Sequence, residues 1–113
     1  MKILDNIITI NELKEIANNT FGSMIKAVVD VEKKLIAIDA ELHSDLEALF
    51  IENSSKQKNL WGINLYPDVD DEDFLEFDSM INIRPNQGNK SRSVDSPEIQ
   101  KKIIEVVNKW IKR

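Results

Sequence analysis

The sequence contains no cysteine and only one histidine, His43. The absence of cysteine excludes a disulfide framework, a thiol nucleophile and a thiolate metal site. With one histidine, and with no Gly-x-Ser-x-Gly or His-Glu-x-x-His motif, a catalytic triad or a zinc enzyme is hard to assemble. These absences lower the expectation of a hydrolase but leave carboxylate chemistry open. We expect no cofactor, no metal, and a reducing cytoplasm as the compartment.

Long apolar runs are also missing. No stretch approaches the roughly 20 apolar residues of a membrane span, and the N-terminus lacks the basic-then-apolar layout of a secretory signal. We therefore expect no membrane partner. The 113 residues suffice for one domain with a modest core, and the apolar fraction of 42% and charged fraction of 31% are ordinary for a globular protein. Residues 1–113 are thus predicted to form a single domain.

Positive charge is scarce in the first three quarters of the chain. Residues 1–83 hold seven Lys and Arg against seventeen Asp and Glu, a net charge of −10, whereas residues 84–113 hold eight against three, a net charge of +5. One interpretation is a basic helix packed against an acidic sheet, and the other is a basic patch for an anionic partner. The overall charge of −5 argues against nucleic acid as a partner, because general nucleic-acid binding depends on neutralising phosphates.

Helical periodicity and capping residues predict three helices. Asn11 is the predicted N-cap of the first helix. Ser44 and Glu47 have the spacing of a capping box at the start of the second, and Ser96 followed by Pro97 starts the third. The predicted helices span about residues 11–21, 44–52 and 96–112.

Apolar and polar residues alternate in two stretches, about 24–42 and 60–84, and each predicts a β-hairpin. If Val29 lies opposite Ile36 in the first hairpin, Lys26 falls opposite Asp39 as a favourable cross-strand pair. Two hairpins interleaved with helices indicate an α+β fold with a mostly antiparallel sheet and helices packed on one face. The other face of the sheet would then be polar and open.

That polar face is the first candidate binding surface. Asn is poorly suited to strands, so Asn64 and Asn82 each suggest a partner that satisfies the amide. The alternative is the ordinary solvated face of a half-buried sheet. The alternation places these polar residues on the face: Lys26, Asp30, Asp39, Glu41, Asn64, Glu76, Asp78, Asn82 and Arg84.

The loop at residues 86–93 is the second candidate. Its single glycine permits positive φ and inward-facing N–H groups, while Lys90 and Arg92 supply charge. Such a loop can hold a phosphate or carboxylate beside the N-terminus of the next helix, although it lacks the spacing of a P-loop. The alternative is a flexible surface loop. From both candidates the predicted ligand-binding residues are Asn64, Asn82, Arg84, Asn86, Gly88, Asn89, Lys90, Ser91 and Arg92.

Acidic residues near His43 and in the second hairpin suggest metal sites only weakly. Glu41, His43 and Asp45 resemble a metal-binding trio, yet Asp45 is already explained as a first-turn acid at a helix N-terminus. If the protein is an enzyme, His43 is the obvious general base. Residues 68–73 resemble half of a calcium loop but lack the central glycine and distal glutamate. A solvated hairpin loop is the better interpretation of that stretch.

Several stretches carry a resemblance to a known family. They are Trp-Gly-Ile-Asn-Leu-Tyr-Pro at 61–67, Phe-Asp-Ser-Met-Ile-Asn-Ile-Arg-Pro at 77–85 and Gly-Asn-Lys-Ser-Arg at 88–92, with Val-Val-Asp at 28–30 and Glu-Leu-His-Ser-Asp at 41–45. From about residue 11 to 111 the chain resembles a family of small prokaryotic proteins of unknown function. The resemblance implies a cytosolic domain that stands alone, and it supplies no catalytic residues.

Three functions remain open from the residues alone. The leading hypothesis is a small binding or interaction module that takes a polar or anionic ligand, or a protein partner, on the polar face and the 86–93 loop. The first alternative is a small enzyme with His43 or a sheet-face carboxylate as acid or base. The second is a self-associating structural protein, a homo-oligomer, since a chain of this length has little core to spare.

Overall fold

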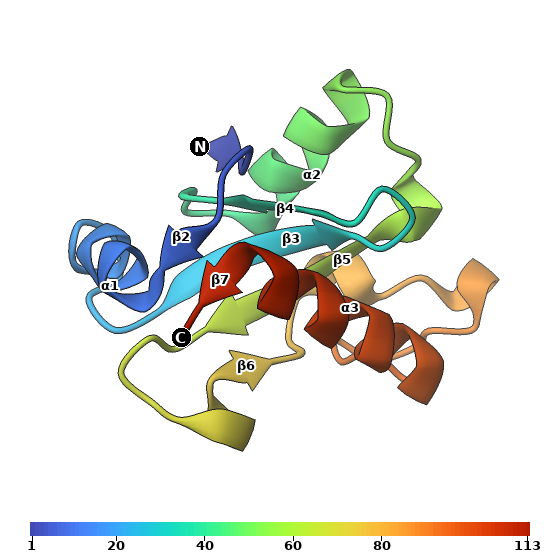
Figure 1. The fold of residues 1–113 in the computed structure, drawn as a ribbon. Helices are drawn as coiled ribbons and strands as arrows, with labels where there is room; N and C mark the ends of the chain where they lie inside the picture. Colours follow the sequence, from blue (N-terminus) through green and yellow to red (C-terminus); the bar gives the residue numbers. More distant parts are fainter.

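The structure is a computed structural model that describes residues 1–113, with only the backbone of Asp71. Its centre is a five-stranded antiparallel sheet with the strand order β1-β4-β3-β5-β6 (Figure 1). The strands are β1 (Lys2–Ile3), β3 (Ile25–Asp30), β4 (Leu35–Ile38), β5 (Leu60–Leu65) and β6 (Leu75–Glu76). Two further short strands, β2 (Ile8–Thr9) and β7 (Ile111–Lys112), pair in parallel. The predicted α+β class with a mostly antiparallel sheet is confirmed.

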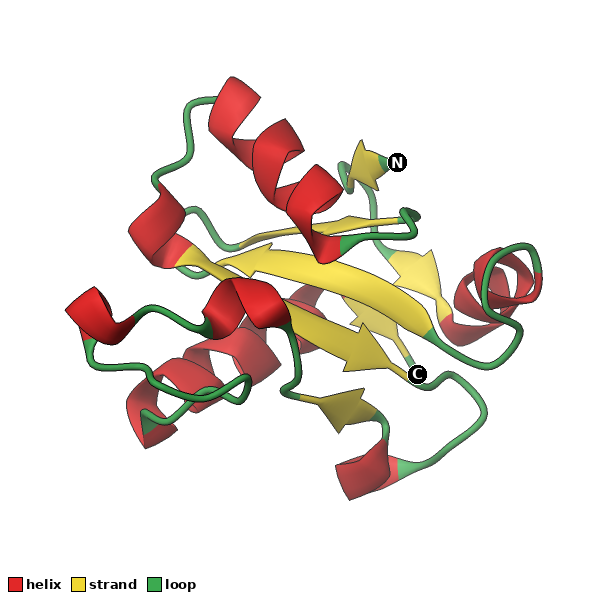
Figure 2. Ribbon diagram, turned by 180° about the vertical axis from the view of Figure 1, so that it is seen from behind, coloured by secondary structure: helices red, strands yellow, loops and turns green.

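Helices cover both faces of the sheet, so their predicted placement on one face was wrong. The helices α1 (Ile10–Asn18) and α3 (Pro97–Trp110) pack with the larger core on one face. The helix α2 (His43–Glu52) lies on the opposite face, as the view from behind shows (Figure 2). The reason is visible in the sequence, because the face assigned as polar also carries apolar residues. Five residues form the core between α2 and the sheet: Leu46 and Phe50 from the helix, and Val28, Ala37 and Leu60 from the strands.

The helix α3 forms as its sequence predicts. The Ser96 hydroxyl accepts a hydrogen bond from the N–H of Ile99 at 3.3 Å, and Pro97 occupies the first turn. Its buried residues Ile103, Val106 and Val107 recur at helical spacing and pack against the sheet. The amphipathic pattern therefore fixes both the helix and the face that it buries.

The first hairpin has the predicted register, with Val29 opposite Ile36. Strand pairing stops at Ile38, because Asp39 has a positive φ of 71°. The Asp39 carboxylate lies 3.4 Å from the N-terminal ammonium group, and Lys26 pairs instead with Asn64 on β5. The neighbour of Lys26 across the sheet is therefore an amide on the second hairpin.

The second hairpin is much shorter than predicted. β6 pairs with β5 only at Asn64 and Leu65, after which the chain leaves the sheet edge. Residues 77–84 were predicted as strand, and this was wrong. The chain there turns over the α2 face of β5 and forms the short 3-10 helix Met80–Asn82. Further 3-10 turns lie at Gln57–Asn59, Asp71–Asp73 and Pro85–Gln87.

No helix in the described chain is both long enough and apolar enough to cross a membrane.

Candidate functional site

Residues 77–92, here called the crossing segment, lie over the α2 face of the sheet and are fixed there by Asn82. The Asn82 Oδ1 accepts a hydrogen bond from the N–H of Gly62 at 2.8 Å, and its Nδ2 donates to the carbonyl of Gly62 at 2.9 Å. The same Nδ2 donates to the carbonyl of Arg92 at 3.0 Å. Asn82 is fully buried. Its side chain therefore joins the middle of β5 to the end of the crossing segment.

Gly62 allows this close approach because it has no side chain. A Cβ at Gly62 would lie 2.5 Å from both Cβ and Oγ of Ser79. Ser79 is itself buried, and its hydroxyl accepts a hydrogen bond from the N–H of Ile81 at 3.3 Å. The crossing segment thus lies directly on the β5 backbone at this point.

Arg84 binds the backbone at the beginning of β5. Its guanidinium donates to the carbonyl of Leu60 at 2.6 Å and to the carbonyl of Gln57. The guanidinium also lies over the Trp61 ring, 4.2 Å from the centroid. Partial burial lowers the pKa of Arg84 from its ordinary value, while Glu47 acts in the opposite direction. These contacts give Arg84 a structural role.

Asn89 holds the predicted binding loop in shape. Its Nδ2 donates to the carbonyls of Asn82 and Ser93, both at 2.8 Å, and its Oδ1 accepts from the N–H of Asp95 at 2.8 Å. Asn89 is buried, and Gly88 before it has a φ of 80°. That positive φ is the one that the sequence anticipated for the loop.

The other predicted loop residues are exposed. The Ser91 hydroxyl donates to Asp95 at 2.7 Å, and this bond lowers the pKa of Asp95. Asn86 and Lys90 face solvent. Arg92 turns back toward the sheet, where its Nε donates to the Asp78 carboxylate at 2.6 Å. Arg92 is therefore the loop residue that reaches the polar end of the sheet.

A pocket of about 180 Å³ opens beside Arg92. It lies on the face seen in Figure 2, where the beginning of α2, the sheet and the crossing segment meet. The predicted residues His43, Asn64 and Arg92 share this pocket, whereas Asn82, Arg84 and residues 86–91 do not line it. The pocket is lined by Lys26, Leu42, His43, Ser44, Asn64, Asp78, Ser79, Met80, Ile81 and Arg92.

His43 is buried in the wall of the pocket, with 9% of its surface exposed. Its Nε2 lies 2.8 Å from the carbonyl oxygen of Ile63. A carbonyl can only accept, so Nε2 carries the proton and Nδ1 holds a lone pair. Burial lowers the pKa of His43, and the cations of Lys26 and Arg92 act in the same direction. At neutral pH the ring is uncharged, and Nδ1 has no hydrogen-bond partner among the described residues.

The N-terminus of α2 borders the pocket, because Leu42, His43 and Ser44 are among its lining residues. The helix begins at His43 with Leu42 at the N-cap position, and no side chain caps it. The capping box predicted from Ser44 and Glu47 does not form. The N–H groups of His43 and Ser44 have no acceptor among the described residues. Unpartnered N–H groups at a helix N-terminus carry partial positive charge and favour anions.

Charged and amide side chains complete the pocket. Lys26 forms no ion pair with a described side chain; its ammonium lies 5.2 Å from the Phe21 ring centroid. Asn64 Nδ2 donates to the Glu76 carboxylate at 2.9 Å and to the Asp78 carbonyl at 3.3 Å. Asn64 Oδ1 is buried without a partner among the described residues. Donors and acceptors thus both remain unpaired in one pocket.

Tyr66 extends the hydrogen-bonded group beyond the pocket. Its hydroxyl donates to Glu76 at 2.9 Å. Burial raises the pKa of Tyr66, as do the hydrogen bond and the negative charge of Glu76. Glu76 therefore holds Asn64 and Tyr66 together and fixes the orientation of the Asn64 amide.

The sequence did not reveal that the α2 N-terminus belongs to the site. A capping box was expected to satisfy its N–H groups, and the signal against it is Leu42, whose side chain has no acceptor. Lys26 was assigned to the polar face, but nothing in the sequence marks its proximity to His43. Among the described residues, no group of three or more His, Asp or Glu is placed to hold a metal ion. The side chain of Asp71, part of the calcium-like stretch, lies outside that description.

Comparison with known proteins places the chain in one family. The model of the family described as "Protein of unknown function (DUF5674)" matches residues 2–110. The chain therefore belongs to this family, and the resemblance to a family of unknown function is confirmed. No curated protein and no solved structure matches the chain.

Proposed function

We propose that the protein is a small binding module that takes a small anionic ligand in the pocket between α2, the sheet and the crossing segment. The observation that carries this proposal is that four residues with hydrogen-bond donors line one cavity. They are His43 and Ser44, whose N–H groups have no acceptor among the described residues, together with Lys26 and Arg92. Only Arg92 among them has an anionic partner in the described structure.

The physical argument is electrostatic. An uncapped helix N-terminus attracts negative charge through its dipole and its free N–H groups. Lys26 and Arg92 add two full positive charges from different elements, and Asp78 offsets one of them. The volume of about 180 Å³ is below the roughly 300–1,000 Å³ of typical ligand pockets. We therefore propose a ligand of a few heavy atoms with a carboxylate or phosphate group.

The crossing segment and the 86–93 loop hold Arg92 in its position beside the pocket. Asn82 donates to the carbonyl of Arg92, and Asn89 donates to the carbonyl of Asn82. Arg92 is thus held at both its side chain and its backbone. In this proposal Asn82 and Asn89 are positioning residues, and Arg92 is the residue that meets the ligand.

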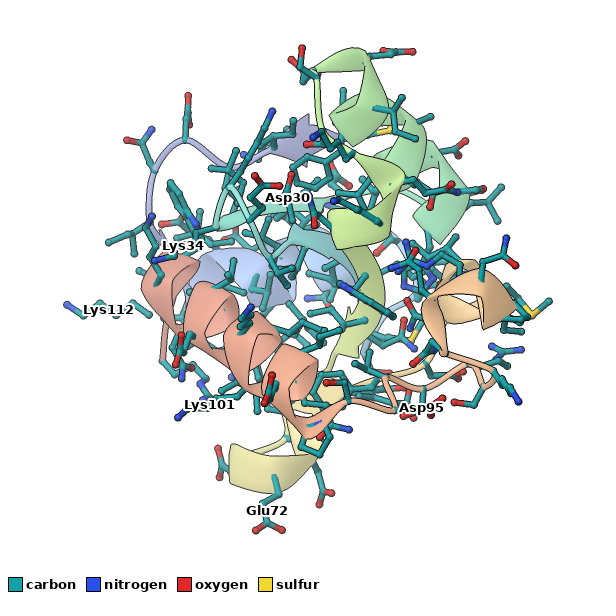
Figure 3. The ribbon with its side chains drawn as sticks, turned by 90° about the vertical axis from the view of Figure 1, so that its right-hand side faces the viewer. Asp30, Lys34, Glu72, Asp95, Lys101 and Lys112 are labelled. Atoms are coloured by element: carbon teal, nitrogen blue, oxygen red, sulfur yellow. The ribbon has the colours of Figure 1, made fainter. Side chains whose placement is uncertain are left out.

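The test is isothermal titration calorimetry with inorganic phosphate, acetate and propionate at low ionic strength. The variants are Lys26→Met and Arg92→Met, and the control is Lys101→Met, since Lys101 lies on the outer side of α3, away from the pocket (Figure 3). We expect binding of at least one anion, weakened about tenfold or more by each pocket variant and unchanged by the control. Equal weakening in the control would mean unspecific attraction, and no binding to any probe would overturn the proposal.

A second candidate is an enzyme with His43 as general base. The observation that favours it is that His43 and Arg92 share the pocket, and that the lowered pKa of His43 leaves Nδ1 able to accept a proton. The test is to follow pocket ligands by NMR over hours for chemical turnover. A catalytic role requires that His43→Gln keeps ligand binding but loses turnover, whereas ligands that stay unchanged with the wild-type protein exclude it.

A further inference from the structure

We infer that the ligand is a small carboxylic acid with a hydroxyl or amino group on the carbon next to the carboxylate. This inference rests on the proposed anion site and names its chemical class. The reason for this ligand class is that two residues lining the pocket carry unpaired hydrogen-bond acceptors, and a simple anion has no donor for them. The two acceptors are His43 Nδ1 and Asn64 Oδ1.

The first acceptor is fixed by the protein backbone. The carbonyl of Ile63 takes the proton of His43 Nε2 at 2.8 Å, so the neutral ring presents the Nδ1 lone pair. His43 belongs to the pocket wall and is 9% exposed. The Nδ1 atom is not among the buried unpartnered atoms, so it is accessible from solvent. A ligand hydroxyl or ammonium group can donate to it, whereas a second anionic oxygen at the same place adds repulsion between lone pairs.

The second acceptor is fixed by the Asn64 amide. Both groups bonded to Nδ2, the Glu76 carboxylate and the Asp78 carbonyl, are acceptors, so the nitrogen has to face them. The oxygen is therefore Oδ1 on the other side, buried and without a partner among the described residues. Asn64 is 6% exposed and lines the same pocket as His43. The two residues that carry the acceptors thus line the same pocket as the four residues that carry the donors.

The size and rim of the pocket limit the rest of the ligand. About 180 Å³ holds a three- or four-carbon acid and excludes a nucleotide or a sugar phosphate of ordinary size. Leu42 and Met80 border the pocket with exposed fractions of 54% and 64%, and Ile81 lies beside them. A short alkyl group can cover these side chains. A carboxylate at the α2 N-terminus with a donor one carbon away has the compact shape that this volume requires.

The experiment compares ligands that differ in one group. Propionate, lactate and alanine have the same carbon skeleton and carboxylate, and they differ in having a hydrogen, a hydroxyl or an ammonium group at the second carbon. We expect lactate or alanine to bind at least about tenfold more tightly than propionate at pH 8, since one lost hydrogen bond to a buried acceptor is worth roughly that factor. Which of the two binds more tightly distinguishes the hydroxy acid from the amino acid.

The source of the preference is tested with His43→Phe and Asn64→Leu, each of which removes one acceptor, and, without any substitution, by lowering the pH. The groups that face His43 are Lys26 from β3 and Asp78 and Arg92 from the crossing segment. Once His43 is protonated, Nδ1 becomes a donor that repels the ammonium of alanine but can still donate to the hydroxyl oxygen of lactate. The preference for alanine over propionate therefore has to shrink at low pH, while propionate binding strengthens. At pH 8 we expect His43→Phe, which has no acceptor, to reduce the preference for both lactate and alanine, whereas glutamine would still present Oε1 as an acceptor.

The outcomes separate the two proposals. Equal binding of propionate, lactate and alanine overturns the ligand class and leaves the anion site standing. A preference of the same size in the wild-type protein, in His43→Phe and in Asn64→Leu also overturns it, because neither assigned acceptor then receives the hydrogen bond. No binding of these acids or of phosphate overturns the anion site and the ligand class together.

Discussion

The side chain of Asn82 hydrogen-bonds both the N–H and the carbonyl of Gly62, twenty residues earlier in the chain. A primary amide has the same donor and acceptor as a peptide unit, so Asn82 forms with β5 the two hydrogen bonds that a neighbouring strand would form. β6 pairs only with Asn64 and Leu65, and Arg84 binds the carbonyl of Leu60. The free edge of β5 is thus closed by a short strand and two side chains, which removes an open edge for aggregation.

Replacing Asn82 with Ala should destabilise the protein strongly. The N–H and carbonyl of Gly62 would remain buried without partners, at a cost of about 1–3 kcal/mol for each group. Asn82→Asp keeps the acceptor for the N–H but sets a carboxylate oxygen against the carbonyls of Gly62 and Arg92. We expect it to be no more stable than Asn82→Ala. Urea unfolding measures both, with the exposed Asn86→Ala as control; a loss below about 0.5 kcal/mol for Asn82→Ala would contradict the proposed role.

Gly62→Ala should also destabilise the fold, and the loss should depend on Ser79. The new Cβ would lie 2.5 Å from Cβ and Oγ of Ser79, and overpacking of this kind costs about 1–3 kcal/mol. Ser79→Gly removes both of those atoms, so Gly62→Ala should cost less in the Ser79→Gly background. A double-mutant cycle in urea measures this coupling. Additive effects of the two substitutions would show that Ser79 is not what excludes a side chain at Gly62.

The sequence predicts the elements that depend on local or periodic signals. The helix α3 follows from Ser96, Pro97 and its apolar stripe, and the first hairpin has the expected register of Val29 and Ile36. The alternation at 77–84 looked equally regular but does not form a strand, because the competing bond is a side-chain contact of Asn82 to a residue twenty positions away. Periodicity carries no information about such a contact. The unsuitability of Asn for a strand was the one usable signal.

The candidate site was predicted only in part, for a related reason. Asn64, Arg92 and His43 do share a pocket, whereas Asn82, Arg84 and Asn89 bind the backbone. Amides and guanidinium groups serve equally well to bind a ligand or to satisfy a distant peptide group. Residue type and spacing therefore locate the polar region of the chain but cannot assign each polar residue within it. The open α2 N-terminus depends on a helix boundary, which sequence patterns place least accurately.

Arg84→Lys should lower stability by about 1–2 kcal/mol, although it conserves the charge. The planar guanidinium donates to two carbonyls and stacks on Trp61, and a single ammonium group cannot do both. The matched control is Arg113→Lys, because Arg113 also stacks on an aromatic ring, Phe74, but is exposed. Thermal unfolding followed by tryptophan fluorescence measures the change. A similar shift for the two substitutions would remove the special role of Arg84.

Lys34→Gly should stabilise the first hairpin slightly. Lys34 has a φ of 58°, in the left-handed region that costs a residue with a side chain about 1–2 kcal/mol. Glycine avoids that cost but has more conformational entropy in the unfolded chain, so a net gain of a few tenths to about 1 kcal/mol is expected. Lys33→Gly, next to it and without a positive φ, should destabilise by about 0.5–1 kcal/mol. Urea unfolding of both variants should therefore give changes of opposite sign, and changes of the same sign would contradict the argument.

His43 should make the stability of the protein depend on pH. Its pKa is lowered in the folded state, so the unfolded chain, with a pKa near 6.5, binds a proton more readily. The free energy of unfolding should therefore be unaffected by His43 above pH 6.5. It should fall as the pH drops below that value, until the folded-state pKa is passed.

Comparison with His43→Gln isolates this effect, since glutamine does not titrate and can still donate to the carbonyl of Ile63. Urea unfolding at pH 8 and pH 5.5 gives the free energies of both proteins. The advantage of the wild-type protein over His43→Gln should be smaller at pH 5.5 than at pH 8. An equal or larger advantage at pH 5.5 would mean that protonated His43 is stabilised in the folded state. That result would contradict the neutral ring on which the ligand preference of the pocket depends.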